Sequence, residues 1–119
     1  MARTTRHWRR VRSKRLRRLV NMKRDFAGAH VPRVDFERLR PSCQFDSSFP
    51  ETYEAWSQLV AEGEALAEQT GSARDPIVVD VDEFERWCAT AAVRPCLPAM
   101  RAFLIVKRYG LSRAVDGDL

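Results

Sequence analysis

The first 24 residues limit where this chain can build a core. They contain eleven arginines and lysines and no carboxylate, whereas the remaining residues contain ten such cations and sixteen carboxylates. A block of like charge repels itself and resists collapse. We therefore expect residues 1–24 to form a disordered basic arm, and the folded part to lie in the acidic remainder of the chain.

The clearest pattern in the acidic part is a run of isoleucine and valine that predicts a short strand near Ile77 to Val81. Its alternation places Ile77, Val79 and Val81 on one buried face. A lone strand cannot satisfy its backbone hydrogen bonds. We expect it to pair either with an extended piece at residues 30–36, where Pro32 limits pairing to an edge, or with the same strand of a second copy. The second alternative predicts a homodimer.

A helix is predicted before this strand. It begins at a capping box formed by Ser48 and Glu51 and continues to about Gln69, with Gly63 interrupting it. Its outer face carries the polar residues Glu54, Gln58, Glu62, Glu64 and Glu68. We interpret this face as solvated and acidic rather than as a metal or acid–base cluster.

Two further helices are predicted after the strand. Asp80 or Asp82 caps the first of them. Its inner stripe is Phe84, Trp87, Cys88 and Ala91. A turn with two prolines at residues 94–98 leads to the second, which Gly110 ends.

These patterns predict a small α+β fold that is mainly α with one or two short strands. Three helices surround one core in a domain at residues 48–110. Prolines and serines recur at residues 25–47 without a sustained apolar period, which predicts an irregular connector. Residues 111–119 are expected to be a frayed tail.

Several classes of function lack their sequence signature. The cysteines Cys43, Cys88 and Cys96 are odd in number and lack Cys-x-x-Cys spacing, which argues against a disulfide framework or a zinc site and favours the reducing cytoplasm. No apolar run approaches the roughly eighteen residues of a membrane span, so we expect a soluble chain. Phosphate-binding and hydrolase motifs are missing. We expect no cofactor and no enzymatic activity.

The basic arm is the candidate binding element. Nine of its eleven cations are arginine, which contacts phosphate through two N–H groups and stacks on bases, so nucleic acid is favoured over a lipid surface. Trp8 could add stacking on a single strand. The cations of the arm are expected to contact the phosphate backbone of DNA or RNA. The predicted nucleic-acid-binding residues are Arg3, Arg6, Trp8, Arg9, Arg10, Arg12, Lys14, Arg15, Arg17 and Arg18.

Two hypotheses follow from this division of charge. In the first, a non-enzymatic accessory protein binds nucleic acid without sequence preference through its arm, and the acidic domain dimerises or docks on a partner. In the second, a protein–protein adaptor uses the arm to bind an acidic protein surface, with no nucleic-acid role. Translation from Met22 would remove nearly the whole arm.

Overall fold

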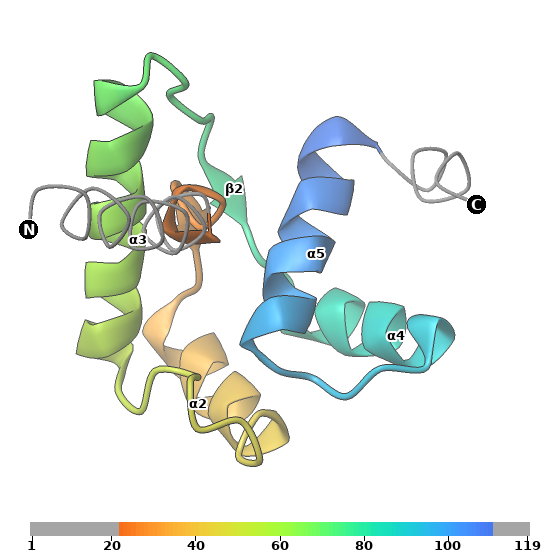
Figure 1. Ribbon diagram of the computed structural model, residues 1–119. Coiled ribbons are helices and arrows are strands. Elements are labelled where there is room, and N and C mark those ends of the chain that lie inside the picture. The colour runs from red at the N-terminus through yellow and green to blue at the C-terminus, as the bar shows by residue number, and fades with distance from the viewer. Residues whose placement is uncertain (1–21, 111–119) are drawn as a thin grey trace, which may run out of the picture.

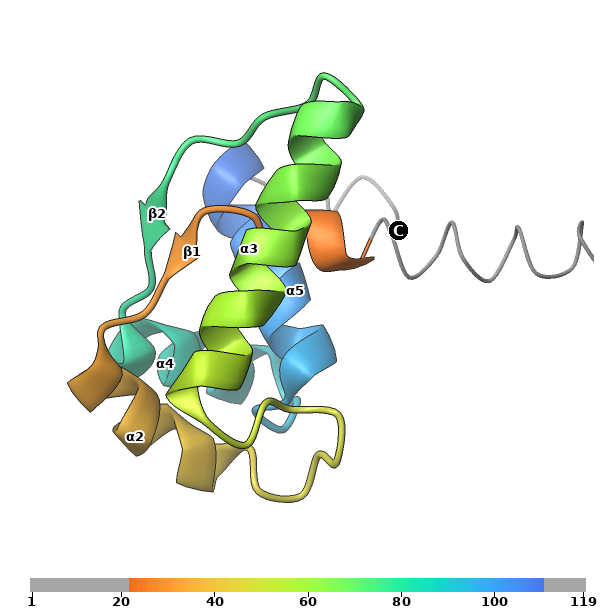
Figure 2. The same cartoon turned by 90° about the vertical axis from the view of Figure 1, so that its left-hand side faces the viewer.

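The computed structural model describes residues 22–110, which are mainly helical with a short two-stranded parallel sheet (Figure 1). The helices are α2 (Arg33–Ser42), α3 (Tyr53–Gln69), α4 (Val81–Ala91) and α5 (Leu97–Tyr109), and the strands are β1 (Ala29–His30) and β2 (Ile77–Val78). Figures 1 and 2 show α3 and α5 on two sides of the molecule, with α2 and α4 together at one end. The predicted mainly α class with short strands is confirmed.

The predicted boundary of the arm is wrong by a few residues. Residues 22–24 are helical and residues 25–28 form a turn, so the last part of the predicted disordered arm belongs to the folded body. The rest of the arm, at residues 1–21, and the predicted frayed tail at residues 111–119 lie outside the described residues.

Helix α2 lies within residues 25–47, where an irregular connector was predicted. Both this connector and the predicted number of three helices are therefore wrong. Phe36 and Leu39 lie three residues apart on one face and are 2% and 0% exposed, so this face packs into the core. Pro32 stands at the N-cap, where no intrahelical hydrogen bond is lost, and Pro41 lies in the last turn, where its missing N–H removes only one hydrogen bond near the helix end. The prolines therefore bracket a helix rather than prevent one.

Helix α3 starts later than the predicted capping box. The N-cap is Thr52, whose hydroxyl accepts a hydrogen bond from Ala55 N–H at 3.0 Å. Ser48 instead donates both its N–H and its hydroxyl to Asp46, at 2.9 and 2.5 Å. The serine is thus engaged in a turn before the helix, and the Ser48–Glu51 prediction is wrong.

The predicted strand pairs within the chain. Strands β1 and β2 are parallel, and Ile77 N–H and Val79 N–H donate to Gly28 O and His30 O, both at 2.9 Å. The partner is thus at residues 29–30 rather than across 30–36. Val78 is 66% exposed whereas Val79 is buried, which confirms the predicted alternation of faces. The edge of β2 that faces β1 therefore has its backbone hydrogen-bond partners within the chain. The homodimer itself stays a prediction.

The helices after the sheet follow the predicted signals. Asp80 caps α4 by accepting from Glu83 N–H at 3.2 Å. Gly110 ends α5 with a left-handed φ of 62°. The predicted inner stripe of α4 is correct at Phe84 and Cys88, but Ala91 is exposed at the helix end.

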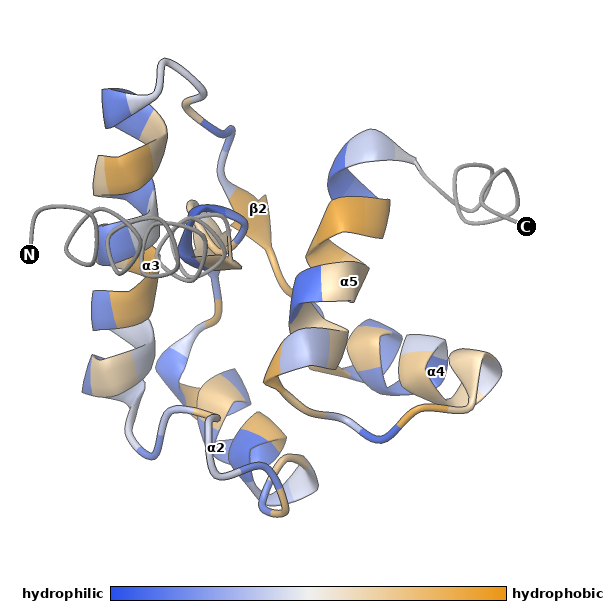
Figure 3. Cartoon of the chain, in the orientation of Figure 1, coloured by the Kyte–Doolittle hydropathy of each residue, from blue (hydrophilic) through white to orange (hydrophobic). Residues whose placement is uncertain are grey.

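Six aromatic side chains are buried in the core, among aliphatic residues and two cysteines. One group surrounds α3 and another lies between α4 and α5, and they join one continuous cluster of buried residues. Figure 3 shows β2 as a hydrophobic segment between α3 and α5. The rings of the first group are Phe26, Phe36, Phe49, Tyr53 and Trp56, and those of the second are Phe84, Trp87 and Phe103. Within residues 22–110, no helix has the length and apolar character needed to cross a membrane.

Candidate nucleic-acid interface

The arm joins the body through residues 22–28, which we call the arm root. Backbone hydrogen bonds close it into successive turns, from Asp25 N–H to Met22 O, from Phe26 N–H to Lys23 O and from Ala27 N–H to Arg24 O. Phe26 is 1% exposed and meets Trp56 edge to face, with ring centroids 5.9 Å apart. The chain that follows the arm is therefore fixed in the core.

Gly63 is the point where the arm root lies on α3. A Cβ at this position would be 2.2 Å from Lys23 O and 3.1 Å from Ala27 N, so only glycine permits this approach of the two backbones. The helix continues without a break through Gly63. The predicted interruption is therefore wrong, and the glycine serves packing. Beside it, Lys23 Nζ and a Glu62 carboxylate oxygen are 3.4 Å apart.

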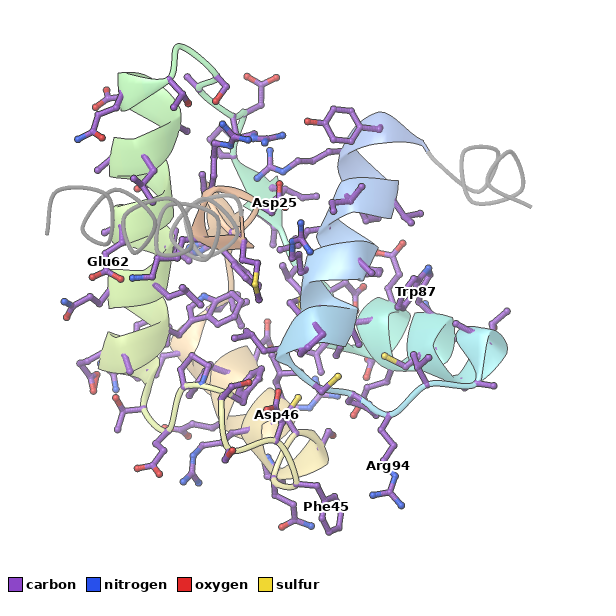
Figure 4. The ribbon with its side chains drawn as sticks, viewed as in Figure 1. Asp25, Phe45, Asp46, Glu62, Trp87 and Arg94 are labelled. Carbon is purple, nitrogen blue, oxygen red and sulfur yellow. The ribbon has the colours of Figure 1, made fainter. Side chains whose placement is uncertain are left out.

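Asp25 ties the arm root to two other parts of the body. Its carboxylate accepts from Arg101 Nε at 2.7 Å and from Arg74 Nη2 at 3.3 Å, and its side chain is 13% exposed (Figure 4). Arg74 also donates to the Tyr109 hydroxyl. One carboxylate thus links the arm root, the loop before β2 and helix α5.

Arg108 adds a third guanidinium to this neighbourhood. It donates to Asp75 O at 2.7 Å and to Ala27 O. Burial, and then the positive charge of Arg74, lower the pKa of Arg108 from its usual value. Three arginines therefore lie around Asp25 and Asp75, which leaves the region beside the arm root with an excess of positive charge.

Arg101 is the member of this group best placed to meet a ligand. Its bond to Asp25 leaves from Nε, so among residues 22–110 its two Nη nitrogens have no hydrogen-bond partner. Its side chain is about one-third exposed. A guanidinium held at Nε and free at both Nη nitrogens can contact phosphate oxygens through two N–H groups.

The structure does not test the predicted contacts of the arm. All ten predicted residues, from Arg3 to Arg18, lie outside the described residues. Sequence reasoning missed Asp25 and its arginine partners. Asp25 is 49 residues from Arg74 and 76 residues from Arg101 along the chain, and no local pattern connects positions so far apart.

The cysteines of the body have the properties of packed thiols. Burial raises the pKa of Cys43 to about 12 and that of Cys88 to about 11, with the nearby Cys96 as the next contribution to both. Both thiols are therefore protonated at neutral pH and are poor nucleophiles. Within residues 22–110, no three His, Cys, Asp or Glu side chains are grouped so that they could hold a metal ion.

No protein family, curated protein or solved structure matches this chain.

Proposed function

We propose that this chain is a small non-enzymatic accessory protein that binds nucleic acid through its Arg-rich arm. The observation that carries the proposal is the division of charge, with eleven cations and no carboxylate in residues 1–24 of a chain whose remainder is acidic. Binding of cations to the phosphate backbone releases counterions and needs no base-specific contact. The arm therefore binds DNA or RNA without sequence preference, and the body dimerises or docks on a partner.

The geometry of the arm root supports this proposal. Gly63 and Asp25 hold the root against α3 and α5, so that a ligand on the arm is tethered to the body. Arg101 extends the positive charge of the arm onto the body, whereas the acidic outer face of α3 repels phosphate. The bound strand is thus directed to the arm and its root rather than to the acidic face of α3.

A salt series tests the proposal. Fluorescent duplex and single-stranded oligonucleotides are titrated with the full chain and with a form that begins at Met22, at salt concentrations between about 50 and 200 mM. Contact with six to ten phosphates predicts that the affinity of the full chain falls by about 10³–10⁵ over this range. The short form is expected to be folded by circular dichroism and to bind neither probe. Equal binding by the two forms would contradict a role for the arm.

The alternative is the adaptor that binds an acidic protein surface and no nucleic acid. One contact favours it, because Lys23 of the arm root already pairs with Glu62 on the acidic face of α3. In this case neither form binds the oligonucleotides at low salt. The arm would instead bind an acidic peptide, and that binding would be lost in the form that begins at Met22.

A further inference from the structure

An exposed aromatic ring lies in the loop between α2 and α3, which precedes the N-terminal end of α3. Phe45 is 75% exposed, which makes it the most exposed large apolar side chain of residues 22–110. The guanidinium carbon of Arg94, in the turn between α4 and α5, lies 5.1 Å from the centre of this ring. Figure 4 shows both side chains at the end of the molecule away from Asp25. The two residues form one small surface, which we call the Phe45–Arg94 pair.

The loops that carry the pair are held in place by hydrogen bonds. Asp46, the neighbour of Phe45, accepts from Leu97 N–H at 2.6 Å at the start of α5. Its own N–H donates to Cys43 O at 3.0 Å, and Val93 N–H donates to Cys88 O at 3.0 Å. The exposed ring is thus presented by an ordered turn, which lowers the entropy that a ligand must overcome.

Arg94 differs in its partners from the four arginines of the body that form ion pairs. Arg33, Arg38, Arg74 and Arg101 each pair with a carboxylate. Within residues 22–110, Arg94 makes no ion pair, and its contact is with the face of Phe45. Its charge is therefore available to an anion while its position is set by the ring.

We propose that the Phe45–Arg94 pair is a second contact for single-stranded nucleic acid, in which a base stacks on Phe45 and the adjoining phosphate binds Arg94. This inference rests on the proposed function and adds a preference for single strands to it. Aromatic rings accept any base as a stacking partner, and a nearby arginine contributes through its charge and its planar group. A duplex keeps its bases stacked inside the helix and so cannot use the ring.

The test uses full-length variants and the same two oligonucleotides. Phe45→Ala is expected to weaken single-strand binding by roughly 5- to 100-fold, the range for loss of one stacked base, and to leave duplex binding unchanged. Phe45→Trp is expected to retain single-strand binding. Val34→Ala, which truncates a side chain that is 67% exposed, is the matched control and should have no effect on either probe.

The charge of the pair is tested separately. Arg94→Ala is expected to weaken single-strand binding and to reduce the slope of log affinity against log salt by about 0.7, the value for one phosphate of a single strand. Arg86→Ala removes a cation of α4 that is also exposed and should leave that slope unchanged.

Three outcomes would overturn the inference. If the full chain binds through its arm but Phe45→Ala changes nothing, the pair is not a contact and the proposed function still stands. If Phe45→Ala weakens duplex and single-strand binding equally, the ring does not act by stacking. If the full chain binds neither probe at low salt, the proposed function and this inference fail together, and an acidic peptide becomes the partner to examine.

Discussion

At the scale of single residues, Gly63 sets how closely the arm root approaches α3. Gly63→Ala gains about 1 kcal/mol of helix propensity but places a methyl group 2.2 Å from Lys23 O, a backbone atom that cannot rotate away. We expect the overpacking to dominate and the free energy of unfolding to fall by about 1–3 kcal/mol in urea denaturation.

The control is Ala65→Gly at an exposed position of the same helix, which reports the propensity alone. It should lose about 1 kcal/mol. A gain of stability in Gly63→Ala would mean that the arm root does not lie on α3 in solution.

Asp46 makes stability depend on pH. Burial alone would raise its pKa, but hydrogen bonds from the Ser48 side chain, from Leu97 N–H and from Ser48 N–H outweigh burial, so its pKa lies below the usual value. A lowered pKa in the folded state stabilises the fold above the unfolded pKa of about 4, and this contribution is lost as the pH falls through the lower, folded value.

The measurement compares the native chain with Asp46→Asn between about pH 7 and pH 2. The variant is expected to be less stable by about 1 kcal/mol at neutral pH, and the difference should close below about pH 4. Glu37→Gln removes an exposed carboxylate and should change the free energy of unfolding by less than about 0.5 kcal/mol. A difference that persists unchanged to pH 2 would contradict the role of ionised Asp46.

At the scale of elements, the sequence predicted helices best where a cap, an apolar stripe or a terminating glycine allowed only one interpretation. The apolar stripe at Phe84 and Cys88 follows an aspartate cap, and Gly110 closes the last helix, so α4 and α5 could be predicted. Helix α2 could not, because proline is read as a helix breaker unless its place at a helix end is known. Ser48 failed as a cap because the helix begins only after Thr52, while Ser48 donates to Asp46 in the preceding turn.

The same limit applies to the candidate interface. The arm is evident from composition, since no fold is needed to recognise a block of eleven cations. The group around Asp25 is not, because it requires the arm root, the loop before β2 and α5 to meet in space. The Phe45–Arg94 pair likewise depends on two loops that only the tertiary structure brings together.

At the scale of the whole molecule, the pairing of β1 with β2 bears on the predicted homodimer. We expect the amides of Ile77 and Val79 to be protected from hydrogen exchange to the same degree at all protein concentrations, because their acceptors are Gly28 O and His30 O of the same chain. Protection that rises with concentration would instead indicate pairing between copies.

Sedimentation measures the homodimer directly. A dimer formed through the strand near residues 77–81 must use the remaining edge of a very short sheet, so a charged substitution there, Val78→Lys, is expected to shift the population to monomer. A native chain that sediments as a monomer at all concentrations would refute the homodimer and leave partner docking as the role of the body.

The ion pair between Asp25 and Arg101 also sets an order of events during synthesis. Translation runs from the N-terminus at about 5–20 residues per second, and Arg101 follows Asp25 by 76 residues. The arm root therefore lacks its contact with Arg101 of α5 for about 4–15 s after Asp25 is made. A nascent chain on the ribosome carries its cationic arm before it has the α5 contacts that join the arm to the body.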